Sequence, residues 1–285
     1  MGAIRKLLGL SLPFGFGTVH RSPATTSRRA ADAKTERAAF DHILNWRLLS
    51  GTHNFPGPDG GTCVNEAAIV AAGLSYRAVV RPQDLPACFS PVIGAYTIRL
   101  NDGMPNGPRQ KLLPYVTRLA GTADDLAIEC RRTECLALAA VRVIAANALR
   151  RAGLTDHAAA WAAVRDLDAA VALFPKWEVN QIDCVKGLRH TTHIAHSAAV
   201  GARECRRYGS LCLDAADDAG RAVIAAARVA VRVADDTQAQ LEVWDEALAA
   251  LDDVLAIGKQ AEAVEPAIAS ERMEKAKRGA LQTLS

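Results

Sequence analysis

One cysteine of the chain lies where a thiol could act as a nucleophile. Residues 60–68 read GGTCVNEAA, so Cys63 follows a glycine-rich loop and precedes an apolar helical pattern. The N-terminus of a helix carries unpaired N–H groups and a partial positive charge, and both favour a thiolate over a thiol. A cysteine-dependent hydrolase or transferase also needs a general base, and His53 lies nearest in the preceding loop. The alternative is that Cys63 is a small buried apolar residue, the usual state of a free cysteine.

A group of histidines suggests metal binding. His190, His193 and His196 are spaced three residues apart, so on a helix they fall within an arc of about 120°. His-x-x-His on a helix can hold a zinc ion, although the remaining ligands would have to come from another helix. Positive neighbours disfavour a cation here, and they are Lys186, Arg189, Arg203, Arg206 and Arg207. A polar helix face is the alternative to a metal site.

The same basic residues raise the question of anion or nucleic-acid binding. The formal net charge of the chain is only +3, and its sequence contains no known nucleic-acid-binding motif. Residues 214–265 are rich in aspartate and glutamate, so a basic helix packed beside acidic helices explains the pattern without a ligand. We therefore do not expect a nucleic acid as partner.

The composition favours helices. Half of the residues are hydrophobic and only 5% are aromatic, with alanine supplying much of the hydrophobic share. Such a chain suits close-packed helices better than a β-sandwich, because strands prefer β-branched and aromatic side chains. The seven cysteines, an odd number, suggest free thiols in a reducing cytosol. No apolar run approaches the length of a membrane span, about 18 residues, so we expect a cytoplasmic protein without a membrane segment.

The N-terminal half is predicted to contain short helices joined by loops rich in proline and glycine, over residues 36–122. For the helix after the glycine-rich loop, Thr62 is a good N-cap, Glu66 places a negative charge in the first turn, and Gly73 ends the helix. Further helices are predicted at 37–50, 91–103 and 108–120. Residues 1–35 are basic and are predicted to be a disordered tail or a targeting segment.

The C-terminal half is predicted to be an Ala-rich bundle of longer helices over residues 123–265. Apolar residues recur there at three- and four-residue spacing, which indicates helices at 123–152, 156–174, 177–208, 214–235 and 236–262. Their alanine faces suit close packing within the chain or across a homodimer. Residues 266–285 are charged and are expected to fray. The predicted fold class is therefore all-α: a block of short helices followed by a helical bundle.

Segments of the N-terminal block resemble a known group of sequences. GTCVNEAA, CFSPVIGAYTIRLNDGMP and LLPYVTRLAGTAD are similar to segments of a family of bacterial and phage-associated proteins with no assigned activity. Many members of that family have His-Pro-x-Cys where this chain reads LPAC, with Leu85 at the position of the histidine. The resemblance implies membership and phage-related context, and it supplies no mechanism.

These observations leave a choice of functions. The leading hypothesis is a non-enzymatic helical interaction protein that binds a protein partner or forms a homo-oligomer. The alternatives are a hydrolase or transferase with Cys63 as nucleophile, and a metal-binding bundle that uses His190, His193 and His196.

Overall fold

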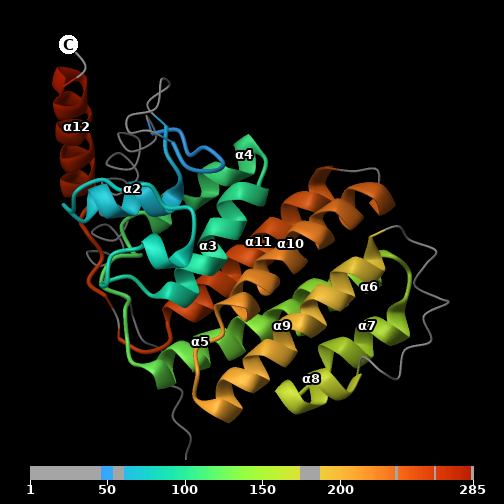
Figure 1. The fold of residues 1–285 in the computed structure, drawn as a ribbon. Helices are drawn as coiled ribbons and strands as arrows, with labels where there is room; N and C mark the ends of the chain where they lie inside the picture. Colours follow the sequence, from blue (N-terminus) through green and yellow to red (C-terminus); the bar gives the residue numbers. More distant parts are fainter. Residues whose placement is uncertain (1–45, 54–60, 174–186, 235–236, 260, 284–285) are drawn as a thin grey trace, which may run out of the picture. The chain divides into compact units, whose positions relative to one another are not determined.

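In the part of the chain that the structure describes, the regular secondary structure is helical, which confirms the all-α prediction. This computed structural model describes residues 46–53, 61–173, 187–234, 237–259 and 261–283 (Figure 1). Within those residues the only extended pairings are two isolated β-bridges, Leu48 with Thr62 and Phe89 with Ala120. None of the helices described is long and apolar enough to cross a bilayer.

The N-terminal half consists of short helices joined by turns. They are α2 (Val64–Ala71), the 3-10 helix η1 (Pro82–Asp84), α3 (Pro91–Gly103), α4 (Asn106–Arg109) and the 3-10 helix η2 (Gln110–Tyr115). Helix α3 begins as predicted, with Pro91 in its first turn and Ser90 as its N-cap. The helix predicted from Pro108 instead divides into α4 and η2. Pro114 lies inside η2, where a proline interrupts α-helical hydrogen bonding.

The helix predicted at 37–50 is wrong for the residues that are described. Residues 46–51 are not helical: Leu48 forms a β-bridge with Thr62, and Leu49 N–H donates to the carbonyl of Thr62 at 3.0 Å. Gly61 permits this pairing, because a Cβ there would come within 2.6 Å of the carbonyl oxygen of Arg47. The preceding residues of the predicted helix, 37–45, lie outside the described residues.

The C-terminal half contains long helices together with several short ones. They are α5 (Leu126–Ala139), the π-helical segment η3 (Ala140–Ala145), α6 (Ala146–Arg151), α7 (Thr155–Ala162), α8 (Leu167–Leu173), α9 (Leu188–Tyr208), α10 (Leu213–Ala234) and α11 (Thr237–Leu255). The long helix predicted at 123–152 is therefore continuous, but its middle widens into a π turn.

The single helix predicted at 156–174 is wrong, because the chain breaks between α7 and α8. Arg142 of η3 fills this break: its Nε donates to the carbonyl of Val164 at 2.6 Å, and its Nη2 donates to the carbonyl of Arg165. A guanidinium from a neighbouring helix thus satisfies carbonyls that a continuous helix would have satisfied internally.

Helix α9 begins later than the sequence predicts. Gly187 has a φ of 99°, in the left-handed region, and the helix starts at Leu188 rather than at residue 177. Residues 177–186 lie outside the described residues. Helix α9 runs through Gly201 without a break. A Cβ at Gly201 would lie 3.0 Å from Cβ of Ala215, so the glycine allows α10 to approach closely.

The core joins the short helices to the bundle. Helix α10 packs against α9, α3 and α11, and α5 packs against α9 (Figure 1). Alanines from these helices are fully buried, together with large side chains such as Tyr96, Trp161 and Trp244. The hydroxyl of Tyr96 donates to the carbonyl of Ala247 at 3.1 Å, which connects α3 directly to α11. The described residues all belong to one compact unit, Ala39–Ser285.

The C-terminal segment is a helix, α12 (Pro266–Thr283), where the sequence predicts a frayed tail. It packs against α2 and buries Ala269 and Met273. Its Arg272 donates from Nη1 to the carbonyl of Ala71 at 2.8 Å, at the last residue of α2. The charged residues that suggested fraying surround a small apolar face, and α2 covers that face.

Candidate functional site

Cys63 is the N-cap of α2, one residue after the predicted cap, Thr62. Its Sγ accepts a hydrogen bond from the backbone N–H of Glu66 at 3.4 Å. The Glu66 carboxylate accepts in return from the backbone N–H of Cys63 at 3.1 Å. This reciprocal pair is a capping box, in which cysteine takes the place usually held by serine or threonine. Cys63, the predicted nucleophile, therefore has a structural role: it caps the N-terminus of α2.

The Glu66 carboxylate is fully buried and joins separate segments of the chain. Besides the N–H of Cys63, it accepts from the hydroxyls of Thr52 at 2.6 Å and Thr62 at 2.5 Å. It also accepts from the backbone N–H of Val79 at 3.1 Å. The sequence predicted Glu66 only as a first-turn charge. Its role as a shared acceptor depends on contacts with distant segments.

The environment of Cys63 opposes a nucleophilic thiolate. The side chain is buried, and burial together with the negative charge of Glu66 raises the pKa of the thiol far above its usual range. His53 bonds through Nε2 to the carbonyl of Ser50 at 2.8 Å. Among the described residues, no hydrogen bond joins the Cys63 thiol to an imidazole. The hydrolase alternative therefore stays a prediction without a base or a reactive thiol to support it.

Cys63 is expected to resist alkylation in the folded protein. At about pH 8 we expect iodoacetamide to label Cys63 at least about a hundredfold more slowly than the exposed Cys88, because the thiol is buried and neutral. Timed labelling followed by mass spectrometry of the peptides measures both rates. Labelling in guanidinium chloride is the control, since both thiols then react. Equal rates in the folded state would restore Cys63 as a candidate nucleophile.

The histidines of α9 do not converge with further ligands. His190 and His193 are exposed, whereas His196 is half-buried, with Nε2 lying 3.3 Å from the carbonyl oxygen of Val171. Burial lowers the pKa of His196, and the nearby His193 and Arg203 lower it further. In the described ranges, no group of three or more His, Cys, Asp or Glu side chains could hold a metal ion. Zinc binding stays a prediction that this geometry does not support.

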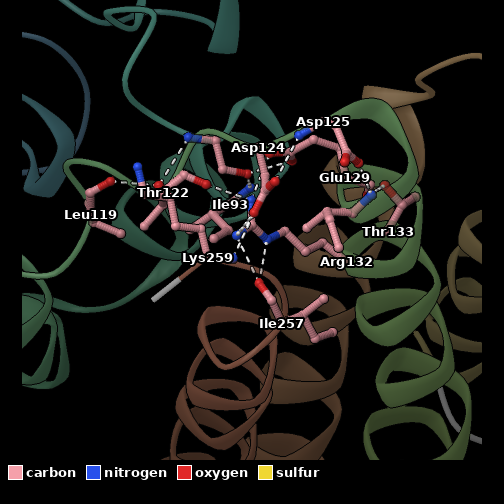
Figure 2. A network of polar contacts seen from close by, with 12 residues as sticks. Ile93, Leu119, Thr122, Asp124, Asp125, Glu129, Arg132, Thr133, Ile257 and Lys259 are labelled. Carbon is pink, nitrogen blue, oxygen red and sulfur yellow. Dashed lines mark hydrogen bonds and ion pairs between the residues drawn. The ribbon is translucent and has the colours of Figure 1, made fainter. Parts of the chain in front are cut away.

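A second buried polar cluster surrounds Arg132 of α5 (Figure 2). Arg132 pairs with the buried Glu129, with Nη1 and Oε1 2.7 Å apart, and the same Nη1 donates to the carbonyl of Thr122 at 2.6 Å. Its Nε and Nη2 donate to the carbonyl of Ile257, just after α11, at 3.1 and 2.8 Å. The second carboxylate oxygen of Glu129 accepts from the hydroxyl of Ser90, the N-cap of α3, at 2.6 Å. The cluster holds the ends of α3, α5 and α11 together, and it has the character of a structural brace.

Helices α5 and α9 enclose a cavity that could hold a ligand. A cavity of about 490 Å³ opens there, and we call it the α5–α9 cleft. The residues that line it include Leu126, Ala127, Cys130, Glu134, Cys205 and Arg206. Burial raises the pKa of the Cys130 thiol, whose Sγ lies 3.8 Å from the carbonyl oxygen of Cys205. The thiol is therefore neutral and contributes to a largely apolar wall.

A second cavity shares one lining residue, Arg206, with the cleft. It has a volume of about 380 Å³ and is lined by Asp168, Arg203, Arg206 and Arg207, and we call it the arginine pocket. Arg206 lines both cavities. It pairs with Glu134 of α5 at 3.6 Å and with Asp168 of α8 at 2.9 Å. The acidic partners of this residue are thus on α5 and α8, and not in the acidic segment 214–265 to which the sequence assigned the basic helix.

Sequence reasoning identified these arginines but not the cleft beside them. Their spacing on α9 is visible in the sequence, and the C-terminal turn of a helix favours positive side chains. The apolar wall comes from α5, and Cys130 and Cys205 are separated by 75 residues. No local pattern signals that these helix faces meet.

Comparison with known proteins does not assign the chain to a family. No family model, curated protein or solved structure matches it. The function must therefore be argued from the cleft and the residues that surround it.

Proposed function

We propose that the protein is a non-catalytic helical binding protein whose ligand site is the α5–α9 cleft. The observation that carries this proposal is the cavity itself, with about 490 Å³ of space and an apolar wall formed by Leu126, Ala127 and Cys130. Sites for small molecules are concave, mostly apolar and have volumes of about 300–1,000 Å³. The cleft has each of these properties.

Two features support binding over catalysis. The nucleophile predicted from the sequence, Cys63, caps a helix and is buried away from solvent. Two cysteines line the cleft: Cys130 has a raised pKa and no histidine bonded to it among the described residues, and Cys205 is buried. A catalytic thiol needs the opposite conditions: a lowered pKa and a base within hydrogen-bond reach.

The proposal also includes a cellular setting. We propose that the protein acts in the cytoplasm, and the free thiols of the described cysteines support this, because a reducing compartment maintains them. A protein partner or a second copy of the chain, expected from the sequence, stays a prediction. The volume of the cleft suits a small molecule better than a folded partner.

The uncharged dye N-phenyl-1-naphthylamine tests the proposal, because its fluorescence rises in apolar surroundings. We expect the native protein to bind it saturably. Ala127→Trp, at an exposed residue that lines the cleft, should weaken binding at least about tenfold by filling the cavity. Fluorescence titration measures the dissociation constant.

The matched control is Ala160→Trp, at an exposed alanine of α7, which should leave the affinity unchanged. Circular dichroism establishes that both variants are folded. Should Ala127→Trp fail to fold, Leu126→Gln alters the same wall at a partly exposed side chain. No saturable binding by the native protein, or equal binding by the cleft variant and the control, would refute the proposed site.

A further inference from the structure

We infer that the natural ligand is an amphipathic monoanion with an apolar body in the α5–α9 cleft and a single carboxylate in the arginine pocket. This inference rests on the proposed function and names the ligand class of the same site. It is carried by Arg206, which lines both cavities, and by the charged side chains that line the second one.

The junction between the cavities is Arg206. Its guanidinium reaches Glu134 on α5 through Nη1 and Asp168 on α8 through Nη2, at 3.6 and 2.9 Å. It therefore stands between a cleft with a mostly apolar wall, whose lining also includes Arg131 and Glu134, and a pocket lined by charged side chains. A ligand that occupies both cavities places its tail against apolar side chains of the cleft and its head group beside the guanidinium groups of the pocket. The geometry suits a molecule with two chemically different ends.

The lining of the arginine pocket has more arginines than carboxylates, and two of these arginines are paired: Arg206 with Asp168 and Glu134, and Arg203 with Glu204. Three arginines and one aspartate line it. Among the described residues, the buried Nε of Arg203 has no hydrogen-bond partner, and its Nη2 lies 3.4 Å from the neighbouring carboxylate of Glu204. For Arg207, no carboxylate lies within ion-pair distance in the part of the chain that the structure describes; its guanidinium lies over the Tyr208 ring, 5.4 Å from the centroid. An anion in the pocket would satisfy donors that the protein leaves without acceptors.

The negative charge that the pocket can accept in a ligand is limited by Asp168. This carboxylate lies in the lining of the pocket and repels each negative charge that enters. A guanidinium presents a planar fork of donors that matches both oxygens of a carboxylate. A monoanion gains the arginine contacts with the least repulsion from Asp168, so we infer a carboxylate rather than a phosphate dianion.

The ligand needs an apolar body because ion pairs with the arginines alone would give only weak affinity. The side chain of Arg206 is 44% exposed, and ion pairs in contact with water contribute little net free energy. Burial of a hydrocarbon tail in the cleft supplies the larger part of the affinity. Leu126 also lines a further cavity of about 400 Å³.

The experiment compares ligands of equal length that differ in the head group. Decanoate, decanol and decyl phosphate each compete with N-phenyl-1-naphthylamine at about pH 8, where the carboxylate is ionised. We expect decanoate to displace the dye at a concentration at least about tenfold below that of decanol. The double variant Arg203→Gln with Arg207→Gln should reduce this preference to about twofold or less, because it removes two of the positive charges that line the pocket.

The matched control is Arg228→Gln, at an exposed arginine of α10, which should retain the preference of the native protein for decanoate. If the double variant does not fold, Arg207→Gln alone removes one exposed member of the pocket and should reduce the preference by a smaller factor.

Several outcomes would overturn the inference, and they are distinct from failure of the proposed function. If decanol and decanoate displace the dye equally while Ala127→Trp still blocks dye binding, the inferred anionic head group is refuted. The proposed apolar binding site is then retained. Stronger displacement by decyl phosphate would contradict the monoanion. A concentration-dependent dimer in sedimentation experiments that Ala127→Trp abolishes would assign the cleft to a second copy of the chain. Absence of saturable dye binding would remove the proposed function itself.

Discussion

Replacement of Arg132 by methionine is expected to lower the free energy of unfolding by about 3–5 kcal/mol, because it removes one partner of a buried ion pair. The side chain of Arg132 is inaccessible to solvent and that of Glu129 nearly so. Without the guanidinium, the Glu129 carboxylate stays buried, and within the described ranges it keeps the hydroxyl of Ser90 as a partner but has no counter-charge. The carbonyls of Thr122 and Ile257 also lose their donors (Figure 2).

The neighbouring Arg131 provides the control for this prediction. It lies on the same helix and is exposed, so Arg131→Met has the same change of residue type without the buried network. We expect the control to change stability by less than about 0.5 kcal/mol. Urea denaturation followed by circular dichroism measures both. Similar midpoints for the two variants would mean that the brace around Arg132 contributes no net stability.

Glu66→Gln is expected to lower the free energy of unfolding by about 2–4 kcal/mol. One carboxylate oxygen accepts from the Thr52 hydroxyl and the Val79 N–H, and the other accepts from the Thr62 hydroxyl and the Cys63 N–H. A hydroxyl can rotate to accept from the new amide, but a backbone N–H cannot. In either orientation, the NH₂ group of glutamine therefore faces one backbone donor. This donor–donor contact is buried, so water cannot relieve it.

Glu274→Gln, at an exposed glutamate of α12, is the matched control and should be nearly neutral. Amide hydrogen exchange adds a local readout. The N–H groups of Cys63 and Val79 should lose protection in Glu66→Gln before the amides of α10 do, because these donors depend on the carboxylate directly. Unchanged stability together with unchanged protection would contradict the assignment of Glu66 as the shared acceptor.

Several elements of the fold were predictable from the sequence because their causes are local. Ser90 and Pro91 begin α3, and Gly73, with a φ of 82°, follows α2 as its left-handed terminator. The apolar spacing along α10 and α11 agrees with helices that bury one face. Such signals act within one or two helical turns, so the order of residues contains them.

The wrong boundaries have causes outside the local sequence. The break between α7 and α8 is stabilised by Arg142, whose guanidinium reaches the carbonyls of Val164 and Arg165 from another helix. Residues 46–51 leave the predicted helix because they pair with the segment before α2. Helix α12 is ordered because α2 covers its apolar face. In each case a tertiary contact outweighs a weak local preference.

The candidate site shows the same division. The sequence by itself determined that the chain is all-α, that a capped helix follows the glycine-rich loop, and that arginines gather at the end of α9. Only the tertiary structure decided that Cys63 is buried beside Glu66, and that the arginines border an apolar cavity formed with α5. The physical reason is the distance along the chain over which each interaction acts. Backbone hydrogen bonding and side-chain periodicity act between near neighbours, whereas burial and cavities depend on which helix faces meet across the folded chain.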